Sequence, residues 1–285
     1  MGKNDTTAEN TNSKSKNKKF NGAVEVNIES KVQYPDFTFT YKSKGTAPRG
    51  DIIAIKAKSK NGKTFLASLL AAVTLGAEMK GFKASYKDSK VLYFDTEQNI
   101  VNTKNVVRRI YTMCEWKYEI NGRIIAYNLR EMELDIRMDF IQEKITEFKP
   151  TAVFIDGIAD LVSNFNDIDT SQALIQRLMK ISSYNKCAIY IVIHTNKGRG
   201  DESMKGHLGT LAWQKCSDVF NIEKQKDMSF LVSESDCRNV PITKFCFKIS
   251  RDGIPYLPKR LNEYIDEEEM YYEDCEEEEE LEDLE

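Results

Sequence analysis

The chain has 285 residues, of which 41% are hydrophobic and 30% are charged, and this length allows one or two domains with a buried core. No run of about eighteen apolar residues occurs, and no apolar segment stands at the start, so the sequence predicts neither a membrane span nor a signal peptide. We therefore expect a cytoplasmic protein. The six cysteines form no CxxC pair and only two histidines are present, which argues against a disulfide framework and a zinc site.

Charge is distributed unevenly along the chain. Residues 266–285 hold 14 of the 45 acidic side chains and no Lys or Arg, which leaves 31 acidic and 41 basic residues elsewhere, a formal balance of +10. Blocks of like charge are typical of solvated tails, and they often compete with nucleic acid for a basic surface. The acidic segment therefore has two interpretations: it competes with nucleic acid for a basic surface of the protein, or it only increases solubility.

Composition predicts three parts. Residues 1–22 are rich in Asn, Ser, Thr and Lys, and such a segment cannot bury enough apolar surface to fold. We expect a disordered polar and basic tail there, a folded domain over residues 23–262, and a disordered acidic tail over residues 263–285.

Strand and helix patterns alternate through the first two thirds of the folded domain. Phe37, Phe39 and Tyr41 alternate as on one face of a strand, which leads into a turn at residues 47–50. Continuous apolar strands that alternate with helices are typical of a parallel sheet covered on both faces, with active groups at the carboxyl ends of the strands. The predicted strands are Ile52–Ala57, Val91–Asp95, Arg123–Asn128, Ala152–Asp156 and Ala188–His194, and the predicted helices are Lys63–Met79, one that ends near Glu115, Asp135–Phe148 and Asp169–Tyr184.

The pattern changes towards the C-terminus, where strand follows strand without helices between them. The predicted strands there are Val219–Glu223, Phe230–Ser233 and Phe245–Ser250. They predict antiparallel hairpins added to the edge of the sheet. The expected fold class is therefore α/β, with a mostly parallel sheet flanked by helices and with antiparallel C-terminal strands.

Residues 57–64, AKSKNGKT, fit the phosphate-binding P-loop pattern with Ala in place of its first Gly. They stand between an apolar strand and a helix, where backbone N–H groups can cradle phosphates, Lys63 can reach the β and γ phosphates, and Thr64 can ligate Mg²⁺. A lysine-rich turn before a surface helix is the alternative, and the context disfavours it. The residues expected to bind ATP are Ala57, Lys58, Ser59, Lys60, Asn61, Gly62, Lys63, Thr64 and Phe65.

Two further strand ends carry carboxylates. Asp156 ends an apolar strand, as does the Walker B carboxylate that orders Mg²⁺ in P-loop proteins, although an Asp that caps the next helix is the alternative. Glu97 follows the strand after the P-loop helix, where hydrolysis needs a carboxylate to orient or deprotonate the attacking water. An acid that only stabilises the helix start is the alternative for Glu97. Asp95 is less favoured as the base because it belongs to the strand end itself.

The P-loop, DTEQ at residues 95–98, FIDGIADLV at residues 154–162 and IHTN at residues 193–196 together resemble the RecA-like ATPases, especially the branch of the hexameric helicases RepA and DnaB. A subgroup of this branch in Bacteroidetes and their mobile elements has similar IDGIADL and HTNKG...GHLGT stretches. The resemblance spans about residues 35–256. It implies a RecA-like core, ATP and Mg²⁺ as cofactors, and a ring of copies that binds single-stranded DNA.

The resemblance also implies roles for residues at and after the end of the strand Ala188–His194, which follows the Asp156 strand. In the family, the polar residue that ends this strand senses the γ phosphate. Here this role falls on His194, with Asn196 beside it. A strand-end His that is merely hydrogen-bonded is the alternative. The glycine-rich loop after it lines the pore in RecA-like proteins, although an ordinary solvent-exposed loop would look alike. The implied DNA contacts are Lys197, Arg199, Lys205 and His207.

Residues 237–239, CRN, resemble the KxRNG hairpin that supplies an arginine finger to the neighbouring subunit in DnaB-like rings. Arg238 matches that arginine. Asp236 replaces the lysine of this pattern and Val240 replaces its glycine, which puts the finger in doubt. An exposed hairpin arginine is the alternative for Arg238, and Arg251 is the other candidate finger.

These features predict a Mg²⁺-dependent ATPase that acts as a ring-forming helicase or translocase on single-stranded DNA. The residues expected to catalyse ATP hydrolysis are Glu97, Lys63, His194 and Arg238. The expected partners are proteins that act in replication or in the mobilisation of a genetic element. No association with a membrane is expected. A RecA- or KaiC-like regulatory or loader ATPase that acts on protein partners is the alternative. A kinase or transporter subunit is disfavoured by DTEQ and by the missing ABC-type signature.

Overall fold

The computed structural model describes residues 23–32, 36–196 and 203–265. The chain divides into two units, Met1–Tyr34 and Pro35–Glu285. In the first unit, residues 23–32 contain a turn but no helix or strand. The expected tails over residues 1–22 and 263–285 lie outside the described residues, apart from residues 263–265, which belong to a helix over residues 259–265.

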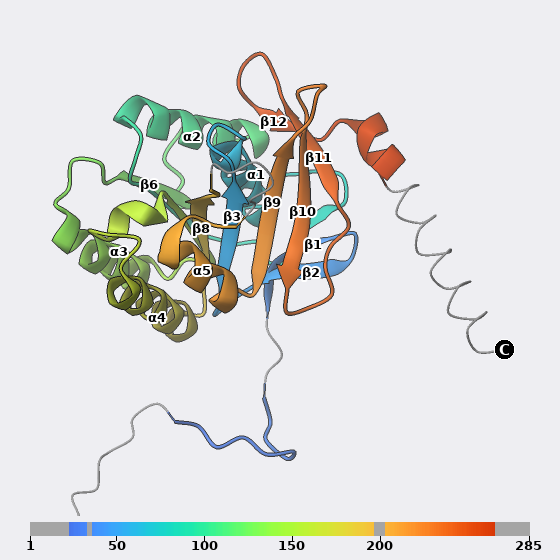
Figure 1. Ribbon diagram of the computed structural model, residues 1–285. Coiled ribbons are helices and arrows are strands. Elements are labelled where there is room, and N and C mark those ends of the chain that lie inside the picture. Colours follow the sequence, from blue (N-terminus) through green and yellow to red (C-terminus); the bar gives the residue numbers. More distant parts are fainter. Residues whose placement is uncertain (1–22, 33–35, 197–202, 266–285) are drawn as a thin grey trace, which may run out of the picture. The chain divides into compact units, whose positions relative to one another are not determined.

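The main sheet of the second unit has nine strands within the described residues (Figure 1). They are β3 (Ile52–Ala57), β5 (Val91–Asp95), β6 (Ile124–Asn128), β7 (Ala152–Asp156), β8 (Ala188–His194), β9 (Asp218–Lys224), β10 (Phe230–Cys237), β11 (Phe245–Ile249) and β12 (Pro255–Tyr256). Their order is β12-β11-β10-β9-β3-β8-β7-β5-β6. The strands from β9 to β6 run parallel, and β10, β11 and β12 are each antiparallel to the preceding strand. The expected fold class is confirmed.

Helices cover both faces of the parallel strands (Figure 1). They are α1 (Lys63–Thr74), α2 (Ile100–Met113), α3 (Leu134–Phe148), α4 (Ile168–Asn185) and α5 (Gly206–Lys215). Leu66 of α1 and Val106 of α2 belong to the core on one face, whereas α3, α4 and α5 supply the core on the other face. Because β3, β5 and β7 are buried on both faces, they read as continuous apolar runs in the sequence.

A smaller sheet in the order β2-β1-β4 lies against the antiparallel strands. It consists of β1 (Phe37–Tyr41), β2 (Lys44–Pro48) and β4 (Phe82–Ala84). Its aromatic rings meet the main sheet at Phe245, whose centroid is 5.4 Å from that of Tyr41 and 5.2 Å from that of Phe82. Only β1 was expected from the sequence pattern. Strands as short as β2 and β4 carry too few residues for alternation to be recognised.

Two helix expectations were wrong. The first helix ends at Thr74, not at Met79, because Gly76 takes a φ of 100°, which ends the helix. The apolar periodicity continues beyond this point because Ala77 and Met79 pack on the same core. Helix α5 was not expected, since its glycines indicate a loop. A Cβ at Gly209 would lie 2.5 Å from the backbone of Met204, so this glycine permits close packing and does not form a turn.

The sheet topology brings the ends of four strands to one edge. Ala57 pairs with His194 across β3 and β8, and Asp95 pairs with Asp156 across β5 and β7. The P-loop, Asp156, His194 and the turn that carries Glu97 therefore lie along one edge of the sheet. Of the helices that the structure describes, none is both long and apolar enough to cross a membrane.

A buried pair of acids lies at the opposite edge of the sheet. Asp218 of β9 and Glu234 of β10 are 1% and 7% exposed, and they share a side-chain hydrogen bond. Glu234 also accepts from Thr46 Oγ1 (2.7 Å) and from Ile242 N (2.8 Å). Burial and the charge of Glu234 raise the pKa of Asp218 to about 7. The folded protein therefore retains a proton here that the unfolded chain releases at lower pH.

This proton predicts a pH-dependent stability. Because the folded pKa lies above the unfolded value, the contribution is fully present below the unfolded pKa and is lost as the pH rises through 7. Between pH 5 and 8 the parent should lose roughly 2 kcal/mol of unfolding free energy relative to the Asp218→Asn variant, measured by urea unfolding. Asp227→Asn is the control, because the pKa of exposed Asp227 is lowered to about 2, outside this range. Equal pH profiles for the parent and Asp218→Asn would contradict the shared proton.

Candidate functional site

The P-loop connects β3 to α1, with Ala57 at the end of the strand and Lys63 at the start of the helix. Gly62 has a φ of 78°, in the left-handed region that favours glycine, and a Cβ there would lie 3.0 Å from the ring of Phe230. Backbone geometry and the close ring therefore both require a glycine. The first N–H groups of α1 have no partner within the helix, so this helix end is suited to bind phosphate.

Lys63 is held inside the loop by its own backbone. Its Nζ donates to Ala57 O (3.1 Å) and Lys58 O (2.9 Å), and it lies 2.9 Å from His194 Nδ1. Burial lowers the pKa of Lys63 to about 8, against the opposing charges of Asp156 and Glu97. Phosphate oxygens would supply further negative charge and raise this pKa again, so nucleotide binding favours the ammonium form.

Asp156 ends β7 and lies beside the P-loop. Its Oδ2 accepts hydrogen bonds from Thr64 Oγ1 (2.7 Å) and Tyr93 Oη (2.8 Å), and Gln98 Nε2 lies 3.5 Å away. Burial raises the pKa of Asp156, and the hydrogen bonds from Thr64 and Tyr93 only partly oppose this. Ionisation of this carboxylate therefore carries a cost, which a nearby cation would offset.

The donor set at this point fits Mg²⁺. A hydroxyl and a carboxylate, from Thr64 and Asp156, meet beside the P-loop, and oxygen ligands of this kind are those that Mg²⁺ prefers. Within the described ranges, no group of three or more His, Cys, Asp or Glu side chains forms a metal cluster. Proteins usually bind Mg²⁺ through one or two carboxylates together with substrate phosphates.

Glu97 and His194 face each other across the same site. Glu97 Oε1 lies 3.6 Å from His194 Nε2, while the other ring nitrogen of His194 contacts Lys63. The His194 ring beside it and the positive charge of Lys63 lower the pKa of Glu97, although partial burial opposes them. Glu97 is therefore ionised at neutral pH, the state that a general base requires.

These residues surround one cavity of about 500 Å³. Its volume falls within the range of small-molecule sites. The P-loop supplies one wall and the ends of β7 and β8 supply another. The lining residues are Ser59, Lys60, Asn61, Gly62, Lys63, Thr64, Phe65, Glu97, Gln98, Asn102, Arg109, Asp156, Gly157, Val192 and His194. Of the nine residues expected to bind ATP, Ala57 and Lys58 lie behind the loop, in a smaller adjacent pocket.

Asp95 holds the local backbone. Its carboxylate accepts hydrogen bonds from the N–H groups of Glu97 (3.2 Å) and Gln98 (2.9 Å) and from Thr103 Oγ1 (2.8 Å). The side chain is fully buried, and it does not line the cavity. Asp95 therefore fixes the turn that presents Glu97 and Gln98.

Arg109 is the main cavity residue that sequence reasoning missed. Its guanidinium carbon lies 4.1 Å from the centroid of the Phe65 ring. Its Nη1 donates to Ser68 Oγ (3.1 Å), and its Nε donates to Gly253 O (2.9 Å) in the turn between β11 and β12. No motif marks Arg109, because it lies in mid-helix and reaches the P-loop only through tertiary packing.

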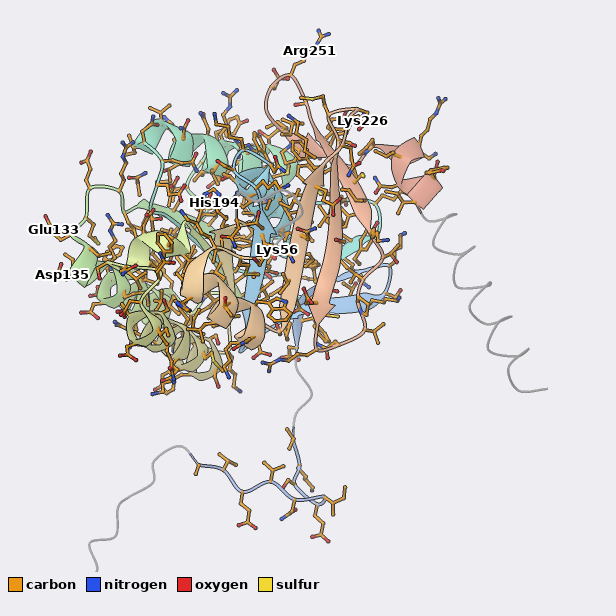
Figure 2. All side chains as sticks on the ribbon, viewed as in Figure 1. Lys56, Glu133, Asp135, His194, Lys226 and Arg251 are labelled. Atoms are coloured by element: carbon orange, nitrogen blue, oxygen red, sulfur yellow. The ribbon has the colours of Figure 1, made fainter. Side chains whose placement is uncertain are left out.

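The structure does not bring Arg238 to this cavity. Arg238 N donates to Ser217 O and its Nη2 donates to Lys215 O (3.2 Å), at the edge of the sheet opposite the P-loop. Arg251 lies in the exposed turn between β11 and β12, at the P-loop edge (Figure 2). Within one chain, Arg238 is thus remote from the nucleotide.

The expected DNA contacts are only partly described. Lys197 and Arg199 lie outside the described residues. Lys205 precedes α5, with its Nζ 4.6 Å from the centroid of the Phe165 ring, and His207 lies in the first turn of α5. The segment between β7 and α4, which contains Phe165, thus packs beside Lys205 at the start of α5.

Replacing the two aspartates should shift stability in opposite directions. Asp156→Asn should stabilise the nucleotide-free protein by on the order of 1 kcal/mol at pH 7, because it removes a buried charge whose folded pKa is raised. Asp95→Asn should destabilise the protein by about 1 to 3 kcal/mol. The substitution replaces one carboxylate oxygen by an NH₂ group, which then faces hydrogen-bond donors of the protein.

Urea unfolding of both variants without nucleotide or Mg²⁺ measures this contrast. Glu143→Gln, on the exposed face of α3, is the control for removal of a single negative charge. A loss of stability in Asp156→Asn as large as in Asp95→Asn would show that Asp156 is a structural residue.

Comparison with known proteins agrees with this geometry. No curated protein matches the chain. A family model described as an AAA domain matches residues 41–200, more than half of the chain, and the match includes the P-loop, Glu97, Asp156 and His194. The AAA domain is an ATPase domain of the P-loop type. The chain therefore belongs to the AAA domain family.

Proposed function

We propose that the protein is a Mg²⁺-dependent ATPase that forms a ring and moves on single-stranded DNA as a helicase or translocase, in replication or in mobilisation of a genetic element. One observation carries the ATPase part of this proposal. Lys63, Thr64, Glu97, Asp156 and His194 come from separate segments and lie around a single cavity.

In the proposed reaction, Lys63 leaves the carbonyl groups of Ala57 and Lys58 and donates to the β and γ phosphates. Thr64 and Asp156 would hold Mg²⁺, and the ion would neutralise charge that develops on the phosphates. Glu97 orients the attacking water and accepts its proton. His194 touches both Lys63 and Glu97, so its position changes when Lys63 engages a γ phosphate.

The DNA and ring parts of the proposal rest on charge and on the position of Arg238. The chain without residues 266–285 has a formal balance of +10, which favours a polyanionic partner. We propose that Lys197, Arg199, Lys205 and His207 contact the phosphates of the strand. The remote position of Arg238 is compatible with a finger only if it reaches the cavity of a second copy, and Arg251 stays the other candidate. Both imply assembly, for which we propose a hexameric ring.

Two substitutions should separate binding from turnover. Lys63→Ala should abolish nucleotide binding, because Lys63 contacts phosphates already in the ground state. Glu97→Gln should retain binding and lower the rate of hydrolysis by roughly a hundredfold or more, because Glu97 acts only on the attacking water. Binding of a fluorescent ATP analogue and phosphate release measure the two quantities. Near-parental hydrolysis by Glu97→Gln would place the base elsewhere.

Single-stranded DNA should raise the rate of ATP hydrolysis, and a non-hydrolysable nucleotide should shift the mass in solution to a multiple of the single chain. Affinity for an oligonucleotide should fall with salt, with a logarithmic slope of about −0.7 per phosphate contact. Lys205→Ala should reduce this slope by about one contact, and Lys180→Ala on α4 is the control. ATPase activity that DNA does not change would favour the regulatory or loader ATPase.

A further inference from the structure

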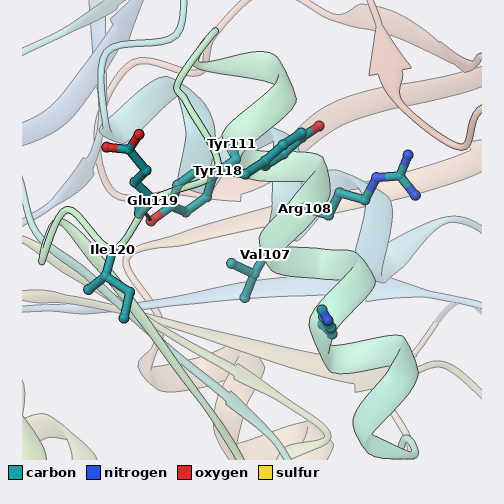
Figure 3. Close-up of a pocket in the computed structure, with 7 residues that line it drawn as sticks. Val107, Arg108, Tyr111, Tyr118, Glu119 and Ile120 are labelled. Carbon is teal, nitrogen blue, oxygen red and sulfur yellow. Dashed lines mark hydrogen bonds between the residues drawn. The ribbon is translucent and has the colours of Figure 1, made fainter.

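A second concave surface lies on the outer side of α2, between this helix and the segment that follows it (Figure 3). We call it the α2 groove. It has a volume of about 610 Å³ and shares no lining residue with the nucleotide cavity. Its lining residues are Lys104, Val107, Arg108, Tyr111, Tyr118, Glu119 and Ile120.

The floor and one wall of the α2 groove are apolar and held in place. The rings of Tyr111 and Tyr118 stack with their centroids 6.2 Å apart. Their hydroxyl groups are engaged, since Tyr111 Oη donates to Glu119 O (2.9 Å) and Tyr118 Oη lies 2.8 Å from Thr112 Oγ1. Tyr111 is only 7% exposed, so Tyr118 presents the aromatic surface that a partner can reach. Tyr118 is 68% exposed and Ile120 is fully exposed. Large apolar side chains that are exposed together around a concave surface often mark an interaction site.

The rim of the α2 groove adds charge. Lys104 and Arg108 stand one helical turn apart on α2, so both cations border the same side of the groove. Figure 3 shows Arg108 on the other side of Val107 from Ile120. An occupant that matches this surface carries apolar or aromatic side chains together with carboxylates. A nucleic acid fits less well, because Glu119 also lines the groove and only two cations do.

We propose that the α2 groove binds the acidic C-terminal segment of the same chain, residues 266–285. This segment has the required composition, because its 14 carboxylates are interspersed with apolar and aromatic side chains. These side chains are Met270, Tyr271, Tyr272, Leu281 and Leu284. The proposal concerns an interaction surface and does not depend on the proposed DNA activity.

The described chain ends within reach of the α2 groove. Glu263 pairs with Lys80 (3.0 Å), which anchors the end of the chain beside the segment that follows α1. Arg123 bridges this region to the groove wall, because its Nη2 donates to Leu75 O and its guanidinium lies 5.0 Å from the Trp116 ring.

Trp116 in turn packs edge-on against Tyr111 in the groove wall, with a centroid distance of 5.4 Å. A few side-chain contacts therefore separate the anchored end of the chain from the groove. A segment of this length spans up to roughly 65 Å when extended, which is ample for that distance.

Cross-linking of the full-length protein tests the proposal. Cys275 lies in the acidic segment, and Ile120→Cys places a thiol at a fully exposed position of the α2 groove, so the substitution should not disturb folding. A short bismaleimide should link residue 120 to Cys275 within one chain. Tyr184→Cys is the matched control, because Tyr184 is 85% exposed on α4, on the other face of the sheet. Peptide mapping by mass spectrometry identifies the linked residues.

Charge reversal gives the second measurement. Lys104→Glu with Arg108→Glu should lower the yield of the 120–275 link by roughly three- to tenfold, whereas Lys180→Glu on α4 with Lys186→Glu just after it should leave the yield unchanged. The parental yield should also fall in high salt. Equal linkage at residues 120 and 184, or linkage only between two chains, would overturn the proposal. An unchanged yield after reversal at Lys104 and Arg108 would also overturn it.

Discussion

The parallel register of β3, β5, β7 and β8 is the constraint on which the site depends. Four strands that start from different parts of the chain end at one edge, because Ala57 is paired with His194 and Asp95 with Asp156. Each strand is buried on both faces, so a slip in register would move apolar side chains as well as site residues. The same packing that stabilises the sheet therefore sets the distances between Lys63, Asp156 and His194.

Three carboxylates meet at this edge, and their surroundings separate their roles. Asp95 is saturated by two N–H groups and Thr103, so it holds the backbone. Burial raises the pKa of Asp156, which leaves a charge that a cation can stabilise. The partly exposed Glu97 has its pKa lowered by His194 and keeps its charge. Chemically similar side chains thus differ because desolvation and hydrogen bonding differ around each one.

Helix α2 contacts both concave surfaces of this face. Consecutive residues of a helix point in directions about 100° apart, so the neighbours Arg108 and Arg109 serve different surfaces. Arg109 lines the nucleotide cavity and holds the turn at Gly253, whereas Arg108 borders the α2 groove. The stacked Phe65 and Arg109 connect this helix to the P-loop.

The sequence by itself determined the parallel strands, the P-loop and the alignment of Asp156 with it, because continuous apolar runs and a fixed phosphate-binding spacing are local properties of the chain. It did not determine β2, β4 or α5, whose short or glycine-containing segments have no distinctive periodicity. Tertiary structure alone decided that Tyr93 and Arg109 join the site, that Asp95 is structural, and that Arg238 lies at the far edge. These contacts join residues remote in sequence, and their geometry depends on how helices and strands pack against one another.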